Sequence, residues 1–202
     1  NYFGLPYSAQ NKATLGIVNI TKPVAAFETV SRSTVEENYD QILSDIVKAK
    51  EFYAKDGVED VANIFMNKAA VSALEARVKL YMNDYNGAIA AASSAIELRG
   101  GSIVSTKSDY AQMFKSLNIS TEDIFVISKS ATDYLSANSL NTLYNDYGMS
   151  VNEETIAEYA STDIRLALLG GDWNGGKMSG IVENAQISNL PVFRLPEMYL
   201  IL

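Results

Sequence analysis

One stretch of this chain has the spacing of an enzyme motif, within a glycine-rich segment near the C-terminal end. The run Gly171-Asp172-Trp173-Asn174-Gly175-Gly176-Lys177 matches G-x-x-x-x-G-K, the opening of a phosphate-binding loop. In such a loop the next residue is Ser or Thr and holds magnesium, but here it is Met178, whose thioether is a poor ligand for a hard cation. We therefore interpret the segment as a solvent-exposed glycine loop and expect no cofactor and no bound metal.

The residue types used most often in catalysis are missing. The chain contains no histidine and no cysteine, so it lacks the commonest general base, the commonest metal ligand and any thiolate nucleophile. The remaining acidic groups, such as Glu36-Glu37 and Glu153-Glu154, precede helical patterns, where carboxylates favour the helix dipole. We expect a protein that is not an enzyme and has no catalytic residues.

Aromatic side chains are the better candidates for binding. Large rings in polar, loop-like sequence have little reason to be core and can stack on sugar rings or peptides; they are Tyr134, Tyr144, Tyr147 and Trp173. Other tyrosines lie on helical faces and are predicted to pack; they are Tyr39, Tyr53, Tyr81 and Tyr85. The first group is the predicted ligand-binding set.

Bulk composition narrows the class of protein. With 202 residues, 48% hydrophobic and 20% charged, the chain has the composition of one globular domain. Its net charge of -8 argues against binding to nucleic acid or to an anionic membrane surface, which both favour clustered Lys and Arg. No apolar run approaches the roughly 20 residues needed to cross a bilayer.

The elements that must position such residues are mainly helical. Residues 67–97 read as two helices joined at Asn83-Asp84 and stopped at Gly100-Gly101, with small residues where the helices touch. The spacing of Ala76, Tyr85, Ala88, Ala92 and Ala95 is that of a tetratricopeptide (TPR) helical hairpin, in which the tyrosine wedges the corner. Such a hairpin needs neighbours to bury its apolar face, which predicts a helical binding scaffold.

The rest of the chain alternates helices with irregular sequence. Ser33-Thr34-Val35-Glu36-Glu37 offers two overlapping capping boxes for an amphipathic helix reaching about residue 55. Further expectations are an irregular segment over 1–31, a short helix within 108–117, a strand over 123–127, a loop with one short helix over 130–152, two helical pieces within 153–169, a loop over 170–189 and a helix starting at Pro196.

Several segments, in order, resemble the SusD/RagB family of outer-membrane nutrient-binding lipoproteins. Tyr2 to Tyr7 (YFGLPY) is similar to its Y-G-x-P-Y element, and Arg32 to Ile46 (RSTVEENYDQILSDI) to its R-x-[ST]-V-x-E-x-Y-x-x-I-x-x-D-L helix. The hairpin from Asn67 follows as in the family. Asp163-Ile164-Arg165 matches its D-x-R element, and Leu190 to Leu200 (LPVFRLPEMYL) is similar to its P-x-x-R-x-x-E-x-Y-L signature.

The resemblance implies a mainly α fold, with TPR-like hairpins in a right-handed scaffold, irregular loops and a minor strand component. It implies one SusD-like domain over residues 1–202, incomplete at both ends because family members are longer. It further implies a non-catalytic protein of the outer membrane, exposed at the cell surface through a lipid anchor outside this chain. That protein captures a nutrient, most often a glycan, for a SusC-like TonB-dependent transporter in polysaccharide utilisation. The resemblance also predicts structural roles for Arg165, Arg194 and Glu197, as buried pairs of arginine with a carboxylate or a helix end.

A second class of function stays open at this point. A TPR-like adaptor would bind a protein or peptide partner in its helical groove. The two hypotheses place the ligand differently, on loop aromatics in the first and along the helices in the second.

Overall fold

The structure is a computed structural model that describes residues 4–114, 118–130, 132–133, 147, 151–169 and 189–202. These residues divide into two compact units. One comprises Asn1–Ala62, Met66–Gly100 and Glu197–Leu202, and the other Asn63–Phe65 and Gly101–Pro196. Each unit has its own core and is described separately.

The first long helix of the helical unit begins where the sequence predicts. α1 spans Val35–Tyr53, and of the two possible capping boxes the structure uses Thr34 with Glu37. The Thr34 Oγ1 accepts from the Glu37 N–H at 3.1 Å, while the Thr34 N–H donates to Glu37 Oε2 at 2.7 Å. Ile46 of α1 packs with Val71 and Val78 of α2, so one apolar stripe of α1 becomes core.

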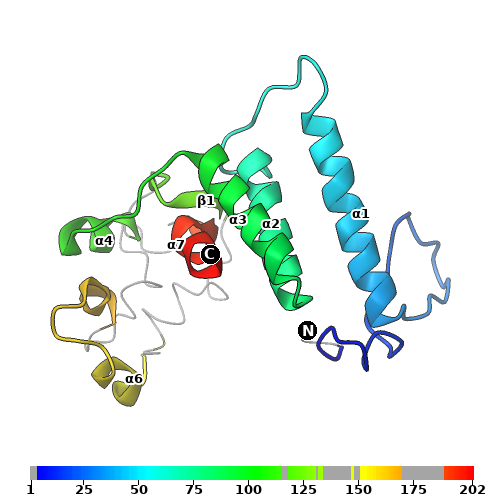
Figure 1. The fold of residues 1–202 in the computed structure, drawn as a ribbon, viewed down its shortest axis with the longest axis horizontal. Helices are drawn as coiled ribbons and strands as arrows, with labels where there is room; N and C mark the ends of the chain where they lie inside the picture. The colour runs from blue at the N-terminus through cyan, green and yellow to red at the C-terminus, as the bar shows by residue number, and fades with distance from the viewer. Residues whose placement is uncertain (1–3, 115–117, 131, 134–146, 148–150, 170–188) are drawn as a thin grey trace. The chain divides into compact units, whose positions relative to one another are not determined.

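The predicted hairpin is confirmed. α2 spans Lys68–Tyr81 with Asn67 as its N-cap, and α3 spans Tyr85–Arg99 with Asp84 as its N-cap. Gly100 ends α3 in the left-handed conformation, at φ 59°. Figure 1 shows α2 and α3 side by side, with α1 on the other side of α2.

Alanines form the contact between α2 and α3. Each of these alanines is at most 4% exposed; they are Ala69, Ala70, Ala73, Ala76, Ala88, Ala91, Ala92 and Ala95. Small side chains let the two backbones approach closely, as the sequence predicts. The wedge role predicted for Tyr85 is wrong, because its ring is 59% exposed and its hydroxyl donates to Asn83 Oδ1 at 3.2 Å.

The segment before α1 is irregular, as predicted, and is tied to that helix by a buried amide. Asn38 accepts from the Ile17 N–H at 2.8 Å and donates to the Ile17 carbonyl at 3.1 Å. A Cβ at Gly16 would lie 1.9 Å from the Asn38 Oδ1, so only glycine permits this approach. The Arg32 guanidinium adds a hydrogen bond to the Gly16 carbonyl at 2.6 Å.

The second unit contains short elements around a two-stranded antiparallel sheet. They are α4 (Lys107–Met113), β1 (Asp123–Ile127), α6 (Glu153–Ala157), the 3₁₀ helix η2 (Ile164–Leu168) and β2 (Leu190–Arg194). α4, β1 and the two helical pieces in 153–169 match the prediction. β2 was not predicted, and it contains Pro191, a residue that is uncommon within sheets. It pairs with β1, in a register that places Asp123 opposite Arg194 and Phe125 opposite Phe193.

α7 spans Leu195–Ile201 and begins one residue before the predicted Pro196. Its first residues follow directly on β2, so the family-like run in this part of the sequence is a strand that turns straight into a helix. Leu195 and Met198 are both completely buried.

Candidate functional site

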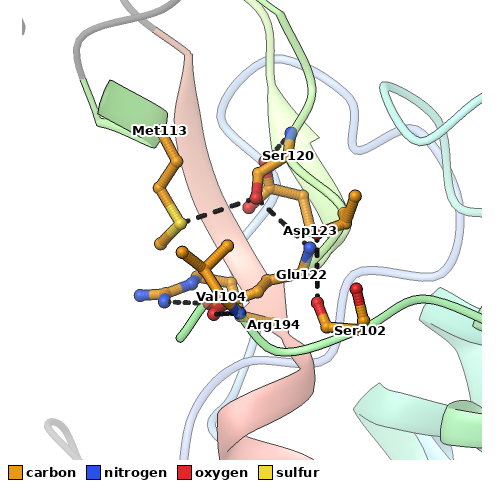
Figure 2. Close-up of polar contacts among 8 residues, drawn as sticks. Ser102, Val104, Met113, Ser120, Glu122, Asp123 and Arg194 are labelled. Carbon is orange, nitrogen blue, oxygen red and sulfur yellow. Dashed lines mark hydrogen bonds and ion pairs between the residues drawn. The ribbon is translucent and has the colours of Figure 1, made fainter. Parts of the chain in front are cut away.

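A buried arginine–glutamate pair lies at the centre of the second unit (Figure 2). Glu122, just before β1, is 1% exposed and accepts a charge-assisted hydrogen bond from Arg194 at the end of β2. Its other carboxylate oxygen accepts from the Val104 N–H at 2.7 Å. The guanidinium carbon of Arg194 lies 4.9 Å from the centre of the Phe114 ring, close enough for a cation–π contact.

Polar contacts on the neighbouring turn complete this cluster. The Asp123 carboxylate accepts from the Ser120 N–H at 2.8 Å, and the Ser120 Oγ accepts from the Glu122 N–H at 3.2 Å. The Thr121 hydroxyl donates to the Ser102 carbonyl at 3.0 Å. Figure 2 shows these groups joining the segment after Gly101 to the strands.

The Glu122–Arg194 pair fits a structural role. A carboxylate used in acid–base chemistry must reach a substrate, but the side chain of Glu122 is enclosed and accepts hydrogen bonds from two different segments. The backbone carbonyl of Glu122 also accepts from the Leu195 N–H at 2.9 Å, which fixes the start of α7. The predicted structural role of Arg194 is therefore consistent with its contacts.

Glu197, the glutamate of the run that resembles the P-x-x-R-x-x-E-x-Y-L signature, pairs with Arg77 of α2. The guanidinium makes two parallel hydrogen bonds to the two carboxylate oxygens, both at 2.6 Å. These hydrogen bonds raise the pKa of Arg77 above its usual value, against the opposing effect of partial burial. The pair joins α2 to α7 within the helical unit, and about a third of each side chain stays exposed.

Arg165 differs from the prediction. It pairs with Asp163 two residues earlier, with an Nη2–Oδ2 distance of 2.6 Å, and its side chain is 56% exposed. Hydrogen bonds from Arg165 lower the pKa of Asp163 to about 2. The same carboxylate accepts from the Arg165 N–H and caps η2. The D-x-R element is thus an exposed local cap, and the expectation of an arginine buried among helices is wrong for this residue.

The predicted ligand-binding aromatics fall mostly outside the described residues. Tyr134, Tyr144 and Trp173 lie there, as does the P-loop-like run over 171–177. Tyr147 is described and its side chain is 64% exposed, as a ring available for stacking must be. Among the helical tyrosines, Tyr39 and Tyr53 pack in the core between α1 and α2, whereas Tyr81 and Tyr85 are more than half exposed.

Sequence reasoning missed the partners of both long-range pairs. Glu122 and Arg77 lie 72 and 120 residues from Arg194 and Glu197. The one available signal is that Glu122 comes directly before the apolar strand β1. If that strand is buried, the charge of Glu122 needs a partner, and this would have pointed to an ion pair. Arg77 gives no such signal, because arginine is common on exposed helix faces.

Among the described residues, no helix is both long enough and apolar enough to cross a membrane. Within the same ranges, no group of three or more acidic residues is arranged to hold a metal ion.

Comparison with known proteins connects this geometry to a family. Residues 1–80 match a family of SusD-like proteins described as starch-binding and associating with the outer membrane. A SusD superfamily protein from Bacteroides vulgatus, 28% identical, superposes with a TM-score of 0.82, over 98% of this chain and 48% of that one. A candidate sugar binding protein from the same species, 26% identical, also gives 0.82, over 98% and 47%. No curated protein sequence matches the chain.

The fold is therefore the mainly helical, TPR-like fold of the SusD superfamily. A SusD superfamily protein from Bacteroides thetaiotaomicron, 23% identical, shares it with a TM-score of 0.76 over 98% of this chain. The family match over residues 1–80 and these neighbours agree with the resemblance to the SusD/RagB family that the sequence predicted. The chain spans about half the length of these structures, with 47–49% of each covered.

Proposed function

We propose that this chain is part of a carbohydrate-binding protein that captures a glycan at the bacterial cell surface and does not transform it. The observation that carries the proposal is the match of residues 1–80 to a starch-binding SusD-like family. The neighbour described as a candidate sugar binding protein, superposed over 98% of this chain, points the same way. Glu122 is buried and its carboxylate already accepts hydrogen bonds from Val104 and Arg194, which is consistent with a binding role rather than acid–base chemistry.

The finer parts of the proposal follow from the family resemblance. The whole protein would deliver its ligand to a SusC-like TonB-dependent transporter in the outer membrane. A lipid anchor outside this chain would attach the protein to that membrane. Residues 1–202 would act as one SusD-like domain, with the helical scaffold as frame and the loops as the ligand-binding face.

Loop aromatics are the proposed contacts with the glycan. The C–H faces of sugar rings are apolar and stack on aromatic rings, so an exposed ring outside the helices is the expected contact. Tyr147 has the required exposure. Tyr134, Tyr144 and Trp173 complete the proposed set on sequence grounds.

Titration calorimetry of the whole protein against a panel of starch-type and other oligosaccharides tests the proposal. We expect one glycan class to bind and to remain chemically intact after incubation. Trp173→Ala, in the same assay, should weaken binding, and an unchanged affinity would remove Trp173 from the site. Failure of every glycan to bind would contradict the function itself.

A further inference from the structure

The helical unit contains a cavity that the glycan proposal does not use. It has a volume of about 330 Å³ and lies where the end of α1, the start of α2 and the end of α3 meet. We call it the hairpin groove; its main lining residues are Lys50, Tyr53, Lys68, Ser72, Ser94 and Leu98. Its size lies at the lower end of the range for small-ligand sites.

The hairpin groove is cationic in an acidic chain. Lys50 and Lys68 both line it, whereas the chain as a whole carries a net charge of -8. Lys50 pairs with Glu75, which also accepts from Lys79 at 2.9 Å. Although burial opposes it, these two lysines lower the pKa of Glu75, so that carboxylate is ionised and already engaged.

Lys68 is the cation left available in the groove. Within the described ranges its ammonium group makes no hydrogen bond or ion pair, and its side chain is half-buried. Asp60 lies before α2, and its Oδ1 accepts from the backbone N–H groups of Val61 and Lys68, at 3.0 and 2.9 Å, rather than from the Lys68 ammonium group. A half-buried ammonium without a protein carboxylate can therefore bind an anion from outside.

The other walls define the rest of the ligand. Ser72 and Ser94 hydrogen-bond to each other, with their hydroxyl oxygens 3.4 Å apart. Ser72 is buried, whereas Ser94 is partly exposed, so Ser94 presents the hydroxyl that can donate to or accept from a peptide group. Leu98, 48% exposed, supplies the apolar surface, whereas Val71 beside it is a buried core residue. The Tyr53 hydroxyl donates to the Met66 carbonyl at 2.7 Å, so Tyr53 offers no free donor for sugar hydroxyls.

We propose that the hairpin groove binds the C-terminal carboxylate of an extended peptide whose last side chain is apolar. Lys68 would bind the carboxylate, the Ser94 hydroxyl would bind the last peptide group, and Leu98 would contact the terminal side chain. Charge complementarity with Lys68 selects the carboxylate, and the exposed Leu98 favours a peptide end with an apolar side chain over a sugar, whose surface consists largely of hydroxyl groups. This inference is independent of the glycan proposal.

Fluorescence polarisation with two labelled probes tests the charge. The probes are the peptide Ala-Ala-Ala-Leu with a free C-terminal carboxylate and the same peptide ending in an amide, which keeps the shape and removes the charge. The acid should bind at least about tenfold more tightly than the amide, since one charge-assisted hydrogen bond is worth roughly that factor. Equal affinity of the two probes, or no binding by the acid at millimolar concentration, would overturn the proposal.

Lysine variants of the whole protein locate the site. Lys68→Gln should weaken the acid about tenfold and leave the amide unchanged, whereas Lys68→Arg should retain most of the binding. Lys48→Gln is the matched control, because Lys48 is on α1, outside the groove, with a side chain 65% exposed. Circular dichroism confirms that each variant is folded. Binding that survives Lys68→Gln, or that Lys48→Gln removes equally, would contradict the assignment.

Two further arms test the apolar contact and the competing ligand class. Leu98→Ala should weaken the peptide ending in Leu but leave one ending in Gly unaffected. A galacturonate oligosaccharide carries carboxylates on a sugar, and we expect it to bind more weakly than the peptide. Tighter, Lys68-dependent binding of the oligosaccharide would replace the peptide with an acidic glycan and so overturn the proposal.

Discussion

The helical unit and the strand-containing unit bury different kinds of side chain. Between α2 and α3 the buried contact consists of alanines, so helix approach depends on local, regularly spaced small residues. Around β1 and β2 the interior contains Glu122 and Arg194, an ion pair formed across 72 residues of sequence. The first kind of interior tolerates no added volume, and the second tolerates no unpaired charge.

The same contrast appears among the three arginine–carboxylate pairs, which differ in burial. The arginine side chain is 17% exposed in the Arg194 pair, 31% in the Arg77 pair and 56% in the Arg165 pair. Solvent screens exposed pairs, so the stability that each pair contributes should follow this order. Mutations in each pair therefore measure how burial changes the contribution of an arginine–carboxylate pair to the free energy of unfolding.

The largest effect is expected at the buried pair. Glu122→Ala should lower the free energy of unfolding by about 3–5 kcal/mol, because Arg194 loses its carboxylate partner in the interior. Urea unfolding followed by circular dichroism gives the value, and hydrogen exchange should show the loss of protection centred on β1 and β2. A change below about 1 kcal/mol would mean that water solvates Arg194 in the native protein.

Overpacking the alanine contact should have the next largest effect. Ala92→Leu adds volume where the side chain is completely buried, and we expect a loss of about 1–3 kcal/mol in unfolding free energy. Ala90→Leu is the matched control, because Ala90 is exposed on the same helix and leucine is a good helix former. Equal effects of the two substitutions would contradict the close packing of α2 on α3.

At the Arg77–Glu197 pair, which is about one-third exposed, the expected loss is smaller. Glu197→Gln removes a charge from the two-hydrogen-bond contact with Arg77 and should cost roughly 1–2 kcal/mol. Partial exposure makes the interaction sensitive to screening, so the difference from wild type should shrink in high salt. Denaturation at low and high salt checks this. A salt-independent loss as large as that of Glu122→Ala would break the proposed order.

The exposed pair should be visible through titration. The folded pKa of Asp163 is about 2, below its ordinary 3.8, so the contribution of this carboxylate to stability is present above pH 3.8 and is lost as the pH falls toward 2. NMR titration of the carboxyl carbon measures the pKa directly. Arg165→Ala should return it toward 3.8, and an unchanged pKa would show that Arg165 is not its cause.

Local patterns predicted the elements of this fold well. The Thr34 capping box, the Asn83-Asp84 turn and the Gly100 stop involve residues within a few positions of each other, so their spacing is sufficient evidence. β2 was missed because its pairing with β1 outweighs the local effect of Pro191. Glu122 and Arg77 were missed because their partners are distant in sequence.

Side-chain roles were harder to predict than elements. Tyr85 has the spacing of a corner wedge, yet it is exposed, because the alanine contact brings α2 and α3 together without it. Arg165 matches a family element, yet its partner is two residues away rather than across the core. In both cases the residue type was informative and the contact depended on three-dimensional neighbours.

The central claim is that loop aromatics bind the glycan and the helical hairpin does not. Tyr147 and Tyr85 are matched for a test, being 64% and 59% exposed on a loop and on the hairpin. With the glycan identified in the panel, calorimetry should show Tyr147→Ala weakening affinity about tenfold, the value of one lost stacking contact, and Tyr85→Ala leaving it unchanged. Loss of affinity in Tyr85→Ala with normal binding by Tyr147→Ala would contradict the account.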